Sequence, residues 1–344
     1  MTADTKNPDR ARPLAEDGHS TRHGATLLDV VHAVENWLLP GLLVIEFVVF
    51  ALLSKQFLSP QNLVNVAVNG SDLALIAAGL TLVVLMGGID VSTGFAVGML
   101  TWVVASMMNA DQAPIVVLAA ALAGGVALGL LNGVLTARFA IPSIVATLGT
   151  SALFQTGLFA LWDNHDLFSG PVFPFLSGQE RFGGVPVLVV IVVGIYVIMH
   201  VILSHTTFGR SIYAIGNNVE AAKLSGINVA RVRLGASVIL GLFIGIAACT
   251  YLARVGSVQA TSGNELTLLA VASVVVGGTS ILGGEGSIPR TLGGVAFIVI
   301  LDNGTVLAGV PSLWNGVIVG LVILVAVSIN GIVVMLNRRE KRSL

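Results

Sequence analysis

The chain has 344 residues, of which 55% are hydrophobic and 10% charged, and its formal net charge is −1. Soluble domains carry roughly a quarter charged residues, so this sequence has too little charge to cover a soluble surface. Its mean hydropathy of +0.93 and its long apolar runs, which match a hydrocarbon layer about 30 Å thick, predict an all-α, polytopic membrane helix bundle.

About ten transmembrane spans are predicted, some of them short enough to be broken or re-entrant. In chain order they are 37–53, 73–88, 94–108, 114–135, 141–162, 185–203, 234–255, 266–282, 291–307 and 313–336. They form a transmembrane domain, 35–336, between a polar tail, 1–34, and a basic tail, 337–344. Two long polar connections, 163–184 and 205–233, interrupt this domain.

The distribution of Lys and Arg predicts the orientation of the bundle. Basic residues concentrate in 205–233 and 337–344 and at Arg138 and Arg290, which all lie on one side if there are ten spans. The positive-inside rule assigns that side to the cytoplasm. We therefore expect a bacterial inner (plasma) membrane protein with both termini in the cytoplasm and 163–184 outside.

Two glycine-rich segments indicate breaks in the helices. Residues 87–94 end the second predicted span and residues 277–284 end the eighth. Their likeness suggests two related halves, as many transporters have, although independent use of Gly at two helix breaks explains it equally well. The residues assigned to these breaks are Asp90, Gly94, Gly277, Gly278 and Gly284.

Small residues recur at GxxxG spacing within the spans. The pairs are Gly94/Gly98, Gly125/Gly129, Gly241/Gly245 and Gly316/Gly320. Such spacing lets helix backbones approach closely, and it is common in any membrane bundle. It therefore favours tight packing inside one chain over association of two chains.

Polar residues inside the spans are the first candidates for a transport pathway, because a charge at the centre of a membrane costs about 2.5–3.5 kcal/mol or more. Glu46 and Asp302 lie within spans, and Asn303 follows Asp302. They either line a path for a hydrophilic solute or make hydrogen bonds between helices, and for Glu46 the structural role is favoured. Asp72 is interpreted as the N-cap of the second span. The candidate translocation path comprises Asn132, Thr147, Thr150, Asp302 and Asn303.

The polar connection before the seventh span contains signals for one short helix. Asn217 or Asn218 suits its N-cap, Glu220 suits its first turn and Gly226 suits its end. These signals predict a helix over 219–225 on the cytoplasmic face. It is interpreted either as a docking element for a partner or as an ordinary ordered loop.

The sequence does not predict an enzyme. It lacks the GxxxxGK[ST], HExxH and GxSxG motifs, its six histidines are scattered, and its single cysteine, Cys249, lies in an apolar run. We therefore expect no catalytic residue, no metal site and no cofactor in this chain.

A set of motifs spread over most of the chain resembles the permeases of ribose-, xylose-, rhamnose- and autoinducer-2-type carbohydrate ABC importers. The motifs are Gly88-Ile89-Asp90-Val91-Ser92, Leu131-Asn132-Gly133, Ile141–Thr150, Phe208-Gly209-Arg210, Ala214–Asn218, Glu220-Ala221-Ala222, Ser225-Gly226-Ile227, Val276–Ser280 and Gly283–Gly286. The resemblance implies a channel-forming permease subunit that moves a small sugar or sugar-like solute, such as a pentose, a deoxyhexose or autoinducer-2.

The resemblance also implies a set of partners. These are cytoplasmic ATPase subunits that bind the ATP, a second permease subunit that is identical or a sister chain, a periplasmic solute-binding protein and membrane lipid, with no nucleic acid. The residues implied to couple to the ATPase are Gly216, Asn217, Glu220, Ala221, Ala222 and Gly226. The rival hypotheses are an ion-coupled secondary transporter that uses Asp302 and a membrane scaffold without transport.

Overall fold

The computed structural model describes residues 27–162, 167–168 and 173–314, and further along the chain 316–318, 320–322, 324–325 and 328. Its helices are α1 (Leu27–Leu53), α2 (Pro60–Asn69), α3 (Ser71–Leu85), α4 (Thr93–Asn109), α5 (Pro114–Ala137), α6 (Ser143–Trp162), α7 (Val187–His205), α8 (Thr207–Asn217), α9 (Val219–Leu224), α10 (Val229–Val255), α11 (Asn264–Val276), α12 (Ile288–Leu307) and the 3-10 turn η1 (Ser312–Trp314). Four two-residue strands, β1 (Leu167–Phe168), β2 (Arg181–Phe182), β3 (Val185–Pro186) and β4 (Ser257–Val258), form the antiparallel pairs β1–β4 and β2–β3.

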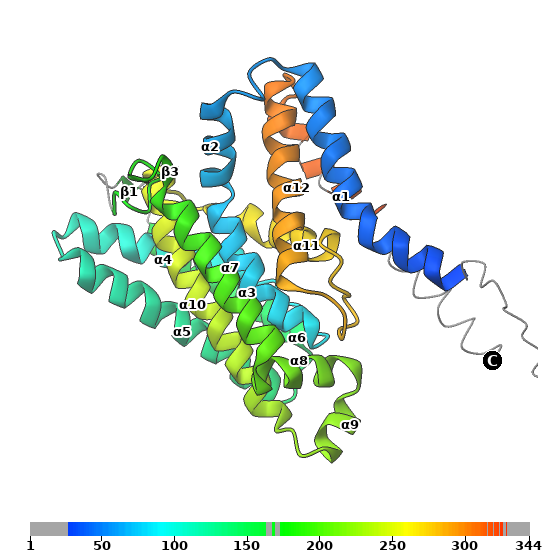
Figure 1. Cartoon of the computed structure of the whole chain (residues 1–344). Helices are drawn as coiled ribbons and strands as arrows, with labels where there is room; N and C mark the ends of the chain where they lie inside the picture. The colour runs from blue at the N-terminus through cyan, green and yellow to red at the C-terminus, as the bar shows by residue number, and fades with distance from the viewer. Residues whose placement is uncertain are drawn as a thin grey trace, which may run out of the picture.

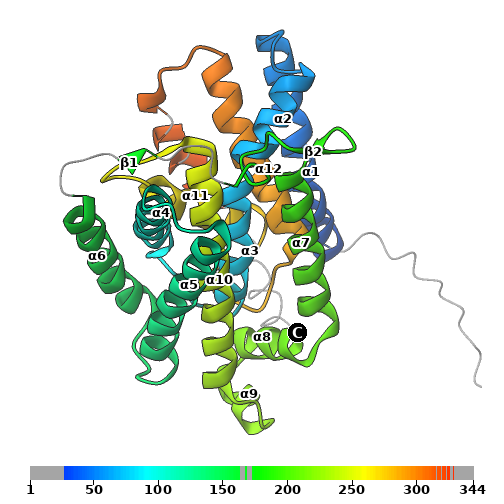
Figure 2. The same cartoon turned by 90° about the vertical axis from the view of Figure 1, so that its left-hand side faces the viewer.

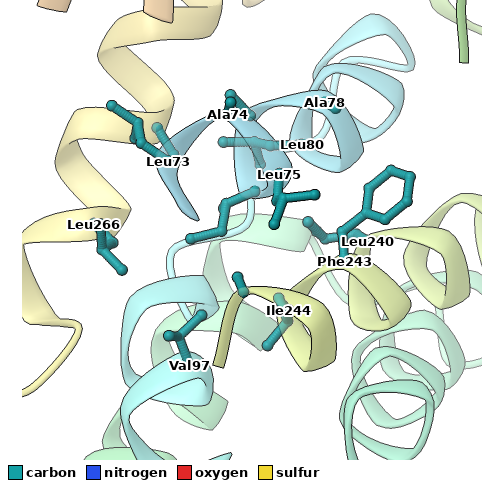
Figure 3. Packing of buried hydrophobic residues seen from close by; sticks show 14 of the residues in the cluster. Leu73, Ala74, Leu75, Ala78, Leu80, Val97, Leu240, Phe243, Ile244 and Leu266 are labelled. Carbon is teal, nitrogen blue, oxygen red and sulfur yellow. The ribbon is translucent and has the colours of Figure 1, made fainter. Parts of the chain in front are cut away.

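Helix α3 forms the centre of the bundle (Figures 1 and 2). Every residue from Ser71 to Leu85 is buried, and α7, α10, α11 and α12 all pack against this helix. Figure 3 shows Leu75 of α3 beside Leu240 and Phe243 of α10. Lipid tails are as apolar as these side chains, so close van der Waals packing, rather than exclusion of water, holds such a core together.

Glycines allow α5 and α10 to cross at backbone contact. A Cβ added to Gly125 would collide with the carbonyl oxygen of Gly241, and one added to Gly245 would collide with that of Ala121. Gly129 meets the backbone of α10 in the same way. The GxxxG pairs on these two helices therefore pack within one chain, as predicted, because only a hydrogen fits between the backbones.

The other two GxxxG pairs differ from each other. Gly94 and Gly98 of α4 lie against the backbone just before α11, which includes Gly263. At Gly316 and Gly320 an added Cβ would meet no atom within 4 Å. Intrachain packing is thus confirmed for Gly94/Gly98, whereas the described residues show no such packing at Gly316/Gly320.

The part of the chain that the structure describes contains five helices long and apolar enough to cross a membrane, α5, α6, α7, α10 and α12. A sixth span results if α2 and α3, which meet at 43°, are counted together. The bend falls at Gly70, next to Ser71, and Gly/Ser pairs are a known cause of kinks. Two shorter apolar helices, α4 and α11, fall below the length of a full span, and the stretch Trp37–Leu53 of α1 is a further apolar segment. The expected ten spans are therefore not confirmed.

Several boundaries differ from the expectation. Helix α1 begins at Leu27, inside the predicted polar tail. Helix α11 ends at Val276 rather than 282, since Gly277 caps it and Gly278 has a φ of +83°. Residues 1–26, the basic tail 337–344 and much of the tenth predicted span lie outside the described residues.

Candidate functional site

The segment between α3 and α4 is organised around the buried carboxylate of Asp90, which is 4% exposed. Its Oδ1 accepts hydrogen bonds from the backbone nitrogen and the hydroxyl of Ser92, at 2.9 and 2.7 Å. Asn132 of α5 donates from Nδ2 to Asp90 Oδ2 at 3.1 Å and to Ser92 Oγ at 2.8 Å. A buried charge is tolerated only with such partners, so α5 braces this helix break.

Helix α6 completes the same group of side chains. The Thr150 hydroxyl donates to Asn132 Oδ1 at 2.8 Å, and Thr147 Oγ1 accepts from the nitrogen of Val91 at 3.2 Å. We call Asp90, Ser92, Asn132, Thr147 and Thr150 the Asp90 cluster. Three of the five residues predicted for the translocation path therefore meet here, all of them buried. Their place on the path stays a prediction.

Replacing Asn132 by Ala should destabilise the protein by about 1–3 kcal/mol, since the buried Asp90 and Thr150 would each lose a hydrogen-bond partner. The measurement is the apparent melting temperature of the purified chain in detergent. Asn65→Ala on α2 is the matched control, because Asn65 makes an exposed hydrogen bond. Equal melting temperatures for the two variants would contradict a bracing role.

A cleft of about 420 Å³ opens where α3 and α11 begin and α10 ends. We call it the Arg254 cleft. Arg254 Nη2 lies 2.7 Å from Asp72 Oδ2, which is 1% exposed. The other polar residues that line the cleft are Asn69, Tyr251, Gln259, Thr261, Ser262, Glu265 and Asp302.

Asp72 does not have the role expected from the sequence. The N-cap of α3 is Gly70, and Asp72 lies in the first turn of the helix, where it forms the ion pair with Arg254. An N-cap residue lies just outside the helix, and here it falls two residues earlier than expected, at Gly70, where α2 and α3 meet. The ion pair joins α3 to α10 across 182 positions in sequence.

Asp302 and Asn303 point to different surroundings although they are neighbours in sequence. Asp302 lines the Arg254 cleft, where it interacts electrostatically with Glu265. Asn303 exchanges two hydrogen bonds with Asn62 of α2, both at 3.0 Å. The structure thus places Asp302 at a cleft and Asn303 in a contact between helices.

Glu46 lies apart from both of these groups. It is 7% exposed on α1, and neither of its carboxylate oxygens has a hydrogen-bond partner among the described residues. The interhelical hydrogen bond that the sequence favoured for Glu46 is therefore not present there.

A second cleft, of about 380 Å³, opens near the start of α10. Arg233, Ile89 and Ser143 line it, and Ser143 Oγ accepts a hydrogen bond from the nitrogen of Ile89 at 3.0 Å. We call it the Arg233 cleft. Arg233 and Arg254 lie near opposite ends of α10, roughly 30 Å apart at 1.5 Å per residue, which is about the thickness of the hydrocarbon layer. The two clefts therefore open at opposite ends of the bundle. Neither Arg233 nor Arg254 was among the site residues predicted from the sequence.

The short helix α9 closely matches its prediction. The Asn218 side chain caps it by accepting from the nitrogen of Ala221 at 3.0 Å. At its other end Gly226 has a φ of +82°, and Ile227 N donates to Ala222 O at 3.1 Å, as in a Schellman motif. Ala222 is buried beneath the helix, whereas Leu224 is 91% exposed. An apolar side chain that is exposed to this extent is available to contact a partner protein.

Both helix breaks meet beside α8, in a group that we call the three-way junction. Gly284, from the break after α11, donates its N–H to the carbonyl oxygen of Leu85, the last residue of α3, at 2.8 Å. Gly216 of α8 lies against both, so a Cβ there would collide with Leu85 O and Gly284 N. Tyr213 of α8 donates its hydroxyl to Gly286 O at 2.8 Å. A displacement of α8 must therefore move the ends of both broken helices.

The Tyr213 hydroxyl keeps its proton in this setting, since burial raises its pKa above the ordinary value of 10.0. It therefore remains a hydrogen-bond donor at neutral pH. The sequence identified both breaks and the residues around Gly216, but nothing local in it showed that these three segments touch.

The chain is thus a multi-pass bundle of apolar helices with a cleft near each end of α10. Residues 62–327 match the family model described as the permease component of a branched-chain amino acid transport system, and the chain belongs to that family.

Three curated relatives align with most of the chain. The ribose import permease protein of Bacillus subtilis is 38% identical over 293 residues, which cover 83% of this chain and 89% of the relative. The autoinducer 2 import system permease protein of Escherichia coli is 35% identical over 295 residues, 84% of each chain. The ribose import permease protein of Escherichia coli is 34% identical over 296 residues, 84% of this chain and 91% of the relative. These findings confirm the resemblance to ribose and autoinducer-2 permeases. No solved structure matches the chain.

Proposed function

We propose that this chain is the channel-forming permease subunit of an ABC importer that moves a small sugar or sugar-like solute, a pentose, a deoxyhexose or autoinducer-2, across the bacterial inner membrane. The observation that carries the proposal is the exposed helix α9, joined to α8, which contacts both helix breaks at the three-way junction. The names of the relatives support the class of solute.

In this proposal the end of the bundle that carries α8 and α9 faces the cytoplasm, together with both termini. ATP is bound by separate ATPase subunits rather than by this chain. A second permease subunit, identical or a sister, completes the pathway in the lipid bilayer, and a periplasmic binding protein delivers the solute to the opposite face.

In this proposal the coupling residues pass on a displacement one after another. Closure of the ATPase pair pushes on α9 through its exposed residues, among them Glu220, Ala221 and Leu224. Asn217 and Gly216 transmit the displacement to Gly284, and through it to the end of α3. Movement of both breaks opens the Arg233 cleft while the Arg254 cleft closes, which is alternating access about broken helices.

Leu224→Asp tests the docking of α9. A charge at the tip of α9 should reduce the amount of ATPase subunit that copurifies with the chain by at least about tenfold, as expected when an interface loses an apolar anchor residue. Copurification is measured on the detergent-solubilised importer. Leu58→Asp is the matched control, since Leu58 is 50% exposed at the opposite end of the bundle. Undiminished copurification with Leu224→Asp would reject α9 as the docking element.

The comparisons do not favour the ion-coupled alternative, because the relatives are named as permease proteins of import systems. Asp302→Asn separates the two. It should leave the ATP requirement of import intact, whereas an ion-coupled transporter would show uptake without ATP and would lose it on this substitution.

A further inference from the structure

We propose that α6 is the contact surface for a second copy of this chain, and that the two copies meet there through Gln155 and Thr156 about a two-fold axis along the membrane normal. The inference rests on the proposed function only for the presence of a second permease subunit. The choice of surface and of an identical partner rests on α6 itself, so the two can be tested separately.

Helix α6 is covered by its own chain on one side. Figure 2 shows it at the edge of the bundle, and it packs against α4 and α5. Its buried residues recur at helical spacing on the side of those two helices, and they are Ala146, Thr147, Thr150, Phe154 and Leu158. The opposite side carries five exposed residues, which we call the α6 face, namely Val145, Gly149, Ala152, Thr156 and Phe159.

Two polar side chains at the α6 face have no partner. Thr156 is exposed and Gln155, beside it, is partly exposed, and neither makes a hydrogen bond to any of the described residues. Other threonines of the apolar helices donate their hydroxyl to the carbonyl oxygen four residues earlier, namely Thr81, Thr101, Thr136, Thr147 and Thr291. Thr156 makes no such bond, so its hydroxyl is free to bond outside its own helix.

Both side chains lie within the depth of the hydrocarbon layer. Thr156 stands six residues before the end of α6 at Trp162, which is about 9 Å at 1.5 Å per residue. Lipid tails offer no hydrogen-bond partner at that depth, whereas Gln and Thr side chains of membrane spans bond across to neighbouring helices. The α6 face therefore suits another membrane helix better than it suits lipid.

The chemistry of the two side chains suits an identical face. An amide and a hydroxyl each donate and accept hydrogen bonds, so each of them can bond to its own counterpart. Two copies of one chain enter the membrane in the same orientation, so the two-fold axis that relates them runs along the membrane normal and keeps each residue at one depth. Residues near the axis then meet their own copies, as an isologous interface requires.

Cysteine cross-linking tests this contact without knowledge of the solute. Thr156→Cys is introduced into the full chain, which is expressed with its partners, and membranes are oxidised with copper phenanthroline. Cys249 is fully buried, so the chain without a new cysteine serves as the blank. The measurement is the fraction of chain that migrates as a disulfide-linked dimer.

Val193→Cys on α7 is the matched control. Val193 is 49% exposed and stands six residues after the start of α7 at Val187, so it lies as far from the connection between α6 and α7 as Thr156 does. We expect at least about ten times more linked dimer at position 156 than at position 193, because a disulfide needs Cβ atoms about 3.8 Å apart. Ala152→Cys, one turn earlier on the α6 face, should behave like Thr156→Cys.

A bulky residue at Gly149 tests the same face by a different readout. A Cβ added there meets no atom within 4 Å, so Gly149→Leu leaves room for the fold of one copy and obstructs the approach of a second. The dimer fraction of the purified chain in mild detergent should fall at least about fivefold, since helices in membranes associate through close packing. Gly194→Leu makes the same change on α7, also with no atom within 4 Å of an added Cβ, and should leave the dimer fraction unchanged.

Cross-linking at position 156 no greater than at position 193, or an unchanged dimer fraction for Gly149→Leu, would overturn the proposal. Either result would mean that lipid, a sister permease or another segment of the same chain covers the α6 face. Import is measured separately in the same cells. A chain that forms the cross-link at position 156 but supports no ATP-dependent uptake would contradict the proposed function and not the contact, whereas uptake without the cross-link would contradict the contact alone.

Discussion

Replacement of Gly216 by Ala should abolish solute import while the importer continues to hydrolyse ATP. An added Cβ would collide with the carbonyl oxygen of Leu85 and the backbone nitrogen of Gly284. Both are main-chain atoms, so α8 must shift away from the two helix breaks. The hydrolysis cycle would then push α8 without moving the breaks. Import and ATP hydrolysis are measured together on the reconstituted importer, and we expect import to fall at least tenfold more than hydrolysis.

Gly194→Ala provides the matched control, since Gly194 lies within helix α7 and an added Cβ there would meet no atom within 4 Å. Gly194→Ala is the same Gly-to-Ala substitution within a helix, and it should preserve import. If Gly216→Ala imports as well as Gly194→Ala does, the three-way junction is not part of the coupling route.

Replacement of Arg254 by Ala should be the most destabilising single change considered for this chain. It leaves Asp72, which is 1% exposed, without the partner that lies 2.7 Å away. Removal of one partner from a buried ion pair costs about 3–5 kcal/mol, because the other charge stays buried and uncompensated. Arg254 itself is partly exposed, so we expect the lower end of that range. The measurement is the loss of folded chain on heating in detergent.

Two further variants distinguish an uncompensated charge from a general loss of packing. Asp72→Asn, added to Arg254→Ala, removes the remaining charge and should recover part of the stability. Lys223→Ala breaks an ion pair with Glu220 of nearly the same length, 2.8 Å, whose side chains are 54% and 78% exposed. Exposed pairs contribute about 0–1 kcal/mol, so this variant should change the stability little. No recovery in the double variant would assign the effect of Arg254→Ala to packing.

Features that depend only on residues close together along the chain could be predicted from the sequence. The apolar runs at 114–135 and 234–255 fall within α5 and α10, because a long uninterrupted apolar segment has one stable conformation in lipid. Asn218 and Gly226 bound α9 as predicted, because caps are formed by atoms only a few residues apart.

The count of spans could not be predicted in the same way. The sequence already indicated that some spans are short enough to be broken or re-entrant, but the length of α4 or α11 alone does not decide whether that helix crosses the membrane. The packing at the Gly70 bend also became visible only in the structure, where Val299 of α12 lies against Gly70.

For the polar residues, too, the sequence indicated which residues matter, and only the structure showed what they contact. The sequence selected Asn132, Thr147 and Thr150 by their type, and they do lie together. Asp90, placed only at a helix break, proved to accept a hydrogen bond from Asn132, which in turn accepts one from Thr150. Asp302 and Asn303 were treated alike, yet adjacent helical residues point about 100° apart, and one lines the Arg254 cleft while the other bonds to Asn62.

The sequence by itself determined that this chain is a membrane bundle of permease type, with two glycine-rich breaks and one capped helix between its spans. The permease type follows from the resemblance of its motifs to a known family, and the other properties follow from composition and from contacts within a few residues. Only the tertiary structure decided that Leu85, Gly216 and Gly284 meet, and that Arg254 pairs with Asp72. Such contacts join segments far apart in the chain, and they exist only after every helix has packed against α3 and α10.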